Sequence, residues 1–222
     1  MTIGRSGESA TSKVVLRDMA DRLVHRGPDS AGLWSSSGGE ISLVHKRLAI
    51  VDLSEAGAQP MASPSGRFMV VFNGEIYNHR ELRKELEAKG GAFDWKGHSD
   101  TETLLAVLCY WGGDGGLERL NGMFAFALWD RRQKTLILAR DRMGEKPLYY
   151  GRSGRSLFFA SELKALLKFP KWTPEINLNA VADLFRFGYI PDPISIYRQV
   201  YKLPPASFLR IRPQEGLNSK PQ

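Results

Sequence analysis

The segment Phe68–Phe72 places the strongest constraint on the fold, because five apolar residues follow one another without interruption. A short run of this kind is typical of a β-strand that is buried on both faces. It ends abruptly in the polar residues Asn73, Gly74 and Glu75. The sequence therefore predicts a well-buried sheet, with polar side chains at the point where one of its strands ends.

Other segments predict a mixture of strands and helices. Further strands are predicted at 41–44, 48–53, 123–129, 135–139, 148–150 and 157–160. Helices are predicted at 14–24, from a capping Asn78 to the glycines at 90 and 91, from a cap at Ser99 or Asp100 onward, at 162–168 after a cap at Ser161, and from a cap at Asn177 or Asn179 to 187. Runs of strands interrupted by a few helices favour an α+β fold with a largely antiparallel sheet.

Length and composition narrow the class of protein. A chain of 222 residues fits one domain whose core needs no disulfide or metal. Its 31 Lys and Arg exceed its 24 Asp and Glu by seven, but these charges are scattered, which disfavours a nucleic-acid partner. No apolar run approaches the ~18 residues of a membrane helix, and no signal peptide is visible. The single cysteine, Cys109, favours a reducing compartment, so we expect a cytoplasmic protein.

The chain divides into three parts by composition. Residues 1–12 are polar and rich in Gly and Ser, and we expect an irregular N-terminal segment there. Residues 13–212 carry the apolar patterns and form the predicted domain. Residues 213–222 have the composition of a linker or tail towards a further domain.

Five motifs occur in a fixed order along this predicted domain. They are HRGPDSAG at 25–32, NGEIYNH at 73–79, SDTE at 99–102, LNGMFAFALWD at 120–130 and ARDRMGEKPLYYG at 139–151. Together they resemble the glutaminase domain of glutamine-hydrolysing asparagine synthetases, a class II glutamine amidotransferase of the N-terminal-nucleophile hydrolase superfamily. The resemblance extends from about residue 25 to about residue 212. It implies a four-layer αββα sandwich of two antiparallel sheets.

The resemblance also implies a reaction. In this family the N-terminal residue attacks the side-chain amide of glutamine, and its own α-amine serves as the base. The products are glutamate and ammonia. An ATP-dependent synthetase domain, absent from this chain, uses the ammonia to form asparagine. We expect ATP and Mg²⁺ only in that domain, no cofactor or metal in this chain, and a possible homodimer.

Family motifs assign roles to residues in three segments of the chain. Asn73 and Gly74 match the oxyanion hole, which stabilises the negative charge of the tetrahedral intermediate. Arg47 matches the group that binds the substrate carboxylate, while Glu75 and Asp100 match those that bind its ammonium. The residues that line the pocket in the family match four consecutive residues of this chain, Leu48, Ala49, Ile50 and Val51.

Each of these residues also has a simpler interpretation. Asn73-Gly74 is a common dipeptide of tight hairpin turns. Arg47, which follows Lys46, would serve equally as a surface residue, and Asp100 as a helix cap.

The first residues depart from the family pattern. Family members begin Met-Cys-Gly-Ile, and the cysteine becomes the nucleophile, whereas this chain begins Met1-Thr2-Ile3-Gly4. The residues that follow, Arg5–Ser9, are too polar for the buried first strand, which is therefore expected to be missing or altered. Three explanations remain open: an incorrect or truncated start, an inactive domain that binds glutamine or a partner without hydrolysing it, or Thr2 as the nucleophile.

Cys109 is not expected to replace the missing nucleophile. It stands within a predicted helix between Leu108 and Tyr110, where a small buried residue is expected, and it has no free α-amine beside it. The sequence therefore predicts a glutaminase domain that partners with a synthetase domain or subunit, with a catalytically inactive glutamine-binding domain as the alternative.

Overall fold

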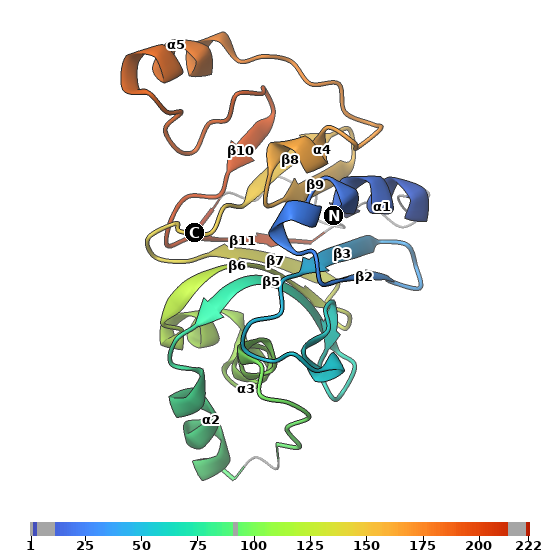
Figure 1. The fold of residues 1–222 in the computed structure, drawn as a ribbon, viewed down its shortest axis with the longest axis vertical. Helices are drawn as coiled ribbons and strands as arrows, with labels where there is room; N and C mark the ends of the chain where they lie inside the picture. The colour runs from blue at the N-terminus through green and yellow to red at the C-terminus, as the bar shows by residue number, and fades with distance from the viewer. Residues whose placement is uncertain (1, 4–11, 91–92, 213–220) are drawn as a thin grey trace.

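The computed structural model describes residues 2–3, 12–90, 93–212 and 221–222. Within them, two antiparallel sheets stack face to face, and helices cover the outer face of each sheet (Figure 1). This arrangement is the predicted α+β fold and the four-layer αββα sandwich that the family resemblance implies. None of the helices in the described part of the chain is long and apolar enough to cross a membrane.

The first sheet has six strands in the order β10-β8-β9-β1-β3-β2. Their bounds are Thr2–Ile3 for β1, Ser30–Ser35 for β2, Ile41–Arg47 for β3, Tyr149–Ser153 for β8, Ser156–Ala160 for β9 and Val200–Lys202 for β10. The second sheet has five strands in the order β11-β7-β6-β5-β4. Their bounds are Met61–Ala62 for β4, Phe68–Ile76 for β5, Gly122–Asp130 for β6, Thr135–Arg140 for β7 and Phe208–Ile211 for β11.

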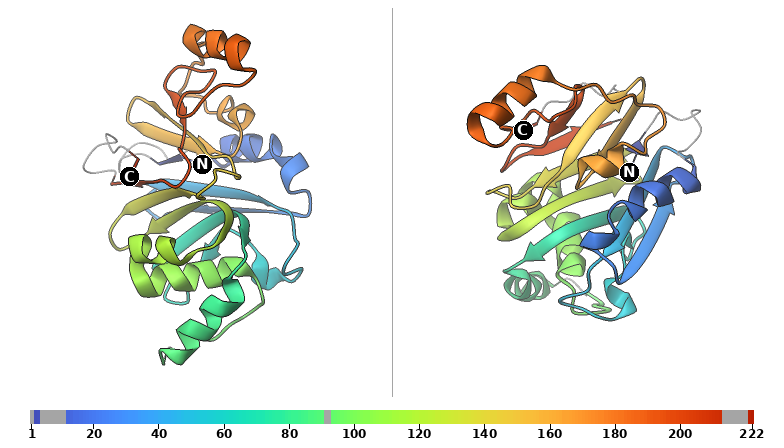
Figure 2. Two further views of the ribbon diagram at one scale, coloured as in Figure 1. Left: turned by 90° about the vertical axis from the view of Figure 1, so that its left-hand side faces the viewer. Right: turned by 45° about the horizontal axis from the view of Figure 1, so that its top comes forward.

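The helices divide between the two outer faces. Their bounds are Lys13–Asp21 for α1, His79–Ala88 for α2, Asp100–Arg119 for α3, Leu163–Leu166 for α4 and Leu178–Phe187 for α5. Short 3₁₀ turns η1 and η2 span Val24–Arg26 and Glu55–Gly57. Helices α1 and α4 lie on the first sheet, α3 lies on the second sheet, and α2 packs against α3 (Figure 1). Helix α5 stands apart from the sandwich (Figure 2).

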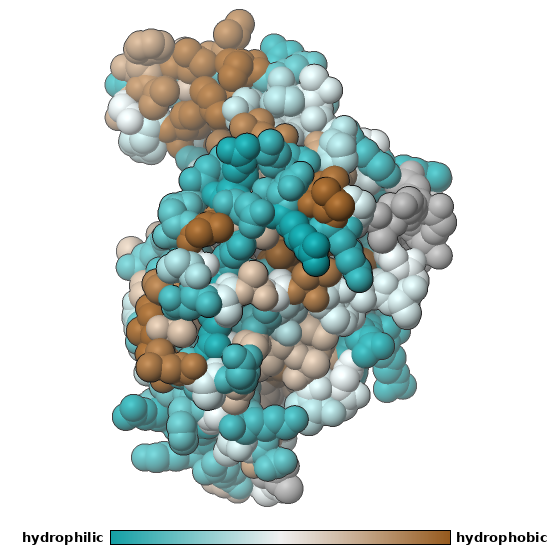
Figure 3. Space-filling view, turned by 45° about the vertical axis from the view of Figure 1, so that its right-hand side comes forward, coloured by the Kyte–Doolittle hydropathy of each residue, from teal (hydrophilic) through white to brown (hydrophobic). Residues whose placement is uncertain are grey.

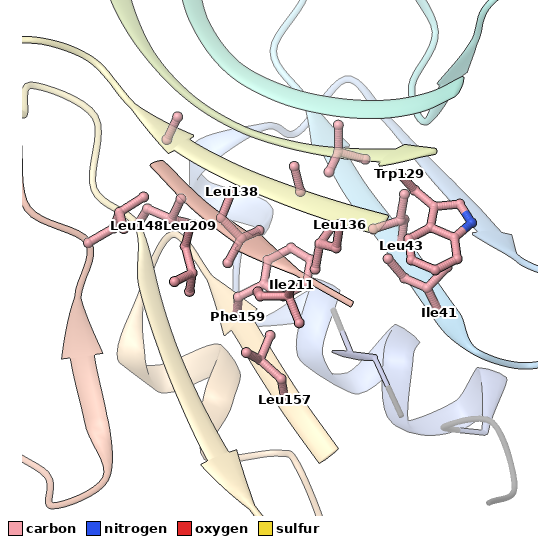
Figure 4. Close-up of a cluster of buried hydrophobic side chains, with 14 of the residues drawn as sticks. Ile41, Leu43, Trp129, Leu136, Leu138, Leu148, Leu157, Phe159, Leu209 and Ile211 are labelled. Atoms are coloured by element: carbon pink, nitrogen blue, oxygen red, sulfur yellow. The ribbon is translucent and has the colours of Figure 1, made fainter. Parts of the chain in front are cut away.

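Alternation along β5 explains why its sequence is apolar without interruption. Met69 and Val71 belong to the core between the two sheets. Leu43 and Leu136 are among the other side chains of this core (Figure 4). Val70 and Phe72 point the other way, into the core beneath α2 and α3. Both faces of β5 are therefore buried, as predicted.

The N-terminal part of the fold differs from the expectation for residues 1–12. Thr2 and Ile3 form β1, a strand of two residues between β3 and β9 in the first sheet. A first strand is thus present in shortened form. The remainder of the predicted irregular segment, residues 4–11, lies outside the described residues. Most of the predicted tail, 213–220, does so too, while Gln222 exchanges backbone hydrogen bonds with Phe208 in β11.

Several local predictions were wrong. Residues 48–53 form a loop instead of a strand, because β3 already ends at Arg47. Asn78 precedes α2 but does not cap it: its side chain bonds Asn121 and Arg119 instead. Ser161 does not cap α4, which begins after Glu162 and has no side-chain cap. In contrast, Ser99 and Asn177 cap α3 and α5 as predicted.

Candidate active site

The residues predicted to bind glutamine line one cavity of about 140 Å³. It lies between the end of β3, the loop that follows, the second half of β5 and the first turn of α3. The predicted residues on its wall are Arg47, Leu48, Ala49, Ile50, Val51, Asn73, Gly74, Glu75 and Asp100. The structure therefore brings together three segments that are distant in the sequence.

Asn73 and Gly74 lie inside β5 and not in a turn. They pair with Ala125 and Phe124 in the middle of the long β5–β6 ladder. The hairpin interpretation of the Asn-Gly dipeptide is therefore wrong. Gly74 is needed there because a Cβ atom would overlap the backbone oxygen of Met123 in the neighbouring strand.

The free edge of β5 determines which way the Gly74 N–H points. Beyond Val70, β5 has no partner on this edge among the described strands, because β4 ends there. The N–H of Phe72 donates to Gln59 Oε1 at 2.6 Å, and the N–H of Ile76 donates to Asp100 Oδ2 at 2.9 Å. Alternate residues of a strand direct their N–H groups to the same side. The Gly74 N–H, midway between them, therefore faces the same edge, where the cavity lies.

The side-chain amide of Asn73 is a donor without a partner. Its Nδ2 atom is buried and makes no hydrogen bond to any described residue. Such a group costs ~1–3 kcal/mol when left unpaired, so an acceptor from a ligand would relieve a real penalty. Phe72, the residue before Asn73, is held through both of its backbone groups. Its N–H donates to Gln59 Oε1, and its carbonyl accepts from His45 Nε2–H at 3.0 Å. Asn73 is thus fixed in place with an unused donor.

Arg47 is buried against the loop that follows β3. Only 9% of its surface is exposed, so the interpretation as a surface arginine is wrong. Its guanidinium donates to the carbonyl oxygens of Ser54, at 2.9 Å, and Asp52. This approach requires a glycine at 57, because a Cβ atom there would overlap the guanidinium. Two of the five N–H donors are used in these bonds, which leaves donors for a carboxylate.

Asp100 is buried at the first turn of α3 and faces β5. The cap of this helix is Ser99, whose hydroxyl accepts from the Glu102 N–H at 3.2 Å, so the interpretation of Asp100 as the cap is wrong. Burial raises the pKa of Asp100, although the bond from Ile76 opposes that effect. A raised pKa indicates a carboxylate that lacks a strong cationic partner, which an ammonium group would supply.

Asp52 organises the cavity, although the sequence assigned it no role. Its Oδ1 accepts from the Ser54 N–H at 2.8 Å and the Ser54 hydroxyl at 2.6 Å, and its Oδ2 accepts from the His98 N–H at 2.8 Å. These bonds lower the pKa of Asp52 to about 2. Asp52 therefore joins the loop after β3 to the residues before α3. The sequence feature that could have indicated a role for Asp52 is its position near the end of the apolar run at 48–53.

A charged cluster lies at the rim. Arg26, from η1, lines the cavity and donates to Glu162 Oε1 at 3.0 Å. The same carboxylate contacts His25 at 2.9 Å and Lys164 at 3.0 Å. Burial alone would raise the pKa of Glu162, but these three partners lower it to about 2. Arg26 and Lys146, which also lines the cavity, were not predicted as site residues.

The N-terminal strand is directed towards this site. Thr2 pairs with Ser42 and Ile3 with Ile41, so the backbone moves along β3 towards Arg47 as it approaches the N-terminus. In β9, the same direction leads from Leu157 to Phe158. Of the two residues of β1, Thr2 is therefore the nearer to the end of β3 that carries Arg47.

Cys109 lies outside the cavity wall. It is exposed at the surface of α3, so the prediction of a buried residue is wrong. Desolvation nevertheless raises the pKa of its thiol to about 11. At neutral pH it is therefore protonated and a poor nucleophile.

Comparisons with known proteins identify the family of the chain. A family model described as a glutamine amidotransferase domain matches residues 2–220. Asparagine synthetase [glutamine-hydrolyzing] 3 of Bacillus subtilis is 38% identical over 93% of this chain and 33% of its own length. Asparagine synthetase [glutamine-hydrolyzing] 1 of the same organism is 37% identical over 96% of this chain and 33% of its own length. The chain thus spans about a third of these relatives.

A solved structure supports the fold. The glutamine phosphoribosylpyrophosphate amidotransferase of B. subtilis, complexed with ADP and GMP, superimposes with a TM-score of 0.68 at 20% identity. The match covers 99% of this chain and 48% of that one. The chain therefore belongs to the glutamine amidotransferase domain family, an enzyme family, and its sequence is similar to about a third of the length of glutamine-hydrolysing asparagine synthetases.

Proposed function

We propose that this domain binds glutamine in the cavity and hydrolyses its side-chain amide, releasing ammonia for asparagine formation by an ATP-dependent synthetase domain. The observation that carries the proposal is the buried Asn73 amide, which has no hydrogen-bond partner in the described structure and lies in the same cavity as Arg47 and Asp100. A cation, a carboxylate and an unused neutral donor are the three groups that one glutamine molecule requires.

The charges of the cavity fit the two ends of the substrate. The Arg47 guanidinium binds the α-carboxylate through the donors that the loop carbonyls leave unused. Asp100 and Glu75 bind the α-ammonium, and Leu48–Val51 form the wall beside the aliphatic chain. The side-chain amide then lies next to β5. Its oxygen becomes negative in the tetrahedral intermediate, where Asn73 Nδ2–H and the Gly74 N–H donate to it.

The nucleophile belongs to the N-terminus. Attack forms an ester or thioester with the glutamate side chain and releases ammonia, and water then cleaves that bond to give glutamate. The α-amine of the first residue accepts the proton of the nucleophile and returns it to the leaving ammonia. In this chain the residue at the start of β1 is Thr2, which gains a free α-amine when Met1 is removed and whose hydroxyl is a weaker nucleophile than a thiol.

Strand β1 carries Thr2 and Ile3 and no thiol, which favours a second candidate, a glutamine-binding domain without turnover. A glutaminase assay separates the two candidates. We expect Thr2→Cys to release glutamate from glutamine faster than the original chain, because it places a thiol at the start of β1. If the original chain is active, Thr2→Ala should lose that activity. No release by Thr2→Cys, in a chain that folds and binds glutamine, would contradict hydrolysis at this site.

An exposed apolar surface supports a synthetase partner. Helix α5 and its flanks expose Ile176, Leu178, Leu184, Phe185, Phe187 and Tyr189. The brown patch at the top of Figure 3 lies over α5 and its flanks. Patches of this kind mark surfaces that another protein covers. In relatives three times as long as this chain, the remaining two thirds of the protein would supply the cover.

A further inference from the structure

A second hollow lies at the other end of the sandwich from the candidate active site. It has a volume of about 400 Å³ and is formed where the β2–β3, β4–β5 and β6–β7 turns meet. Strand β3 runs from this hollow, near Ile41, to the active-site cavity at Arg47. Strand β5 likewise begins beside the hollow at Phe68 and passes the cavity at Asn73. The hollow shares no lining residue with the cavity.

The turns give this hollow an excess of positive charge. Its lining includes Arg67, Arg131, Arg132 and Lys134. Two of these cations are already neutralised: Arg67 pairs with Asp130 and Lys134 with Glu40, each at 2.6 Å. Two positive charges therefore remain.

Those two charges belong to neighbouring exposed residues. Arg131 donates to the carbonyl of Gly66 at 2.9 Å, which holds its guanidinium at the hollow. Neither Arg131 nor Arg132 forms an ion pair with any carboxylate of the described residues. Guanidinium groups present several N–H donors in one plane and bind oxyanions through two of them at once.

A buried donor points to a ligand independently of the charge. Trp129 also lines the hollow, and its side chain is fully buried at the edge of the inter-sheet core. Its indole N–H has no hydrogen-bond partner among the described residues. In Figure 4 the nitrogen lies on the rim of the ring that is turned away from the other labelled side chains. Buried indole N–H groups normally find an acceptor, so this one calls for an acceptor from outside the chain.

We propose that this hollow is a binding site for a small phosphate-bearing anion. Arg131 and Arg132 match the two negative charges of a phosphate group, and the Trp129 N–H donates to one of its oxygens. The ligand is either inorganic phosphate or a phosphate monoester such as a nucleoside monophosphate, since both present the same group. The proposal does not depend on glutamine hydrolysis, because the site lies at the opposite end of β3 and β5.

Proton–nitrogen correlation spectra of the full chain test this site through the indole N–H signals. The Trp129 signal is assigned by its loss in Trp129→Phe. Inorganic phosphate is then added at constant ionic strength, with chloride as the balancing salt. We expect a saturable shift of the Trp129 signal. Arg131→Ala and Arg132→Ala should each weaken the affinity by about tenfold, because each removes a charge-assisted contact.

A matched control uses Arg155→Ala, since Arg155 is also exposed in a β-hairpin turn but does not line the hollow. Its affinity for phosphate should equal that of the original chain. Adenosine 5′-monophosphate identifies the source: tighter binding than phosphate indicates a monoester ligand, and equal or weaker binding indicates free phosphate. A shift that does not saturate, or that Arg131→Ala and Arg132→Ala leave unchanged, would overturn the proposal.

Discussion

Single residues in the cavity are fixed by contacts with the backbone. Arg47 is held by two loop carbonyls, and Asp100 by one strand N–H. Such contacts lower the entropy that each side chain loses when it binds a ligand, so the site is organised before the substrate arrives. Asn73 differs, because its amide nitrogen has no partner in the described structure. Its donor is therefore available without breaking an existing bond.

Cys109 provides a test of reactivity at this scale. Because its pKa is raised to about 11, only a small fraction of the thiol is ionised at pH 8. We expect iodoacetamide to alkylate it more slowly than free cysteine under the same conditions. Mass spectrometry against time measures the rate. Alkylation as fast as free cysteine would contradict this environment, and Cys109→Ser should leave glutamate release unchanged.

Among the secondary-structure elements, β5 was predictable because its short apolar run contains only β-branched and aromatic residues besides Met69 and ends at Asn73-Gly74, which is typical of a strand. The Asn-Gly dipeptide was misleading, since pairing with β6 overrides its preference for turns. The apolar run at 48–53 was wrongly predicted to be a strand, for a different reason. Leu48 and Ile50 are exposed around the cavity, where a ligand rather than a sheet would cover them.

Other elements depend on contacts that no local pattern reveals. Asn78 has the composition of a helix cap, yet its side chain bonds Asn121, which is 43 residues away. The other pocket residues were predicted from family motifs. The contacts of Arg26 and Asp52 were found only in the structure, because their partners are distant in the sequence.

The close approach of β5 and β6 yields a prediction for stability. A Cβ atom at Gly74 would overlap the backbone of Met123, which cannot move aside without disturbing the ladder. We expect Gly74→Ala to lower the free energy of unfolding by about 1–3 kcal/mol, measured by urea denaturation. Gly115→Ala in α3 is the control, because its Cβ would meet only Trp111 at an ordinary 3.8 Å. That control should be neutral or stabilising by about 0.5–1 kcal/mol. Equal effects of the two changes would contradict the packing.

The whole molecule joins its two sheets partly through His45, which bonds from β3 to the Phe72 carbonyl in β5. Desolvation lowers the pKa of His45 to about 4, and the hydrogen bond to Phe72 opposes that effect. The unfolded chain, with an ordinary histidine pKa near 6.5, therefore binds more protons between pH 6.5 and 4.

Stability should consequently fall as the pH drops through this window and stay level above it. The full shift corresponds to about 3 kcal/mol at the low end. Urea denaturation between pH 7 and 5 measures the slope, above the range in which Asp52 and Glu162 take up protons. His45→Gln should reduce the slope of stability against pH. Part of the slope should remain, because the pKa of His79 is also lowered. An unchanged slope in His45→Gln would show that His45 is not neutral and buried.

The central claim is that the cavity binds the amino-acid end of glutamine through Arg47, and calorimetric titration with L-glutamate tests it most directly. We expect saturable binding by the original chain and by Arg155→Ala, and binding at least about tenfold weaker in Arg47→Ala, since one charge-assisted contact is lost. Circular dichroism confirms that each variant folds. Wild-type affinity for L-glutamate in a folded Arg47→Ala chain would contradict the claim.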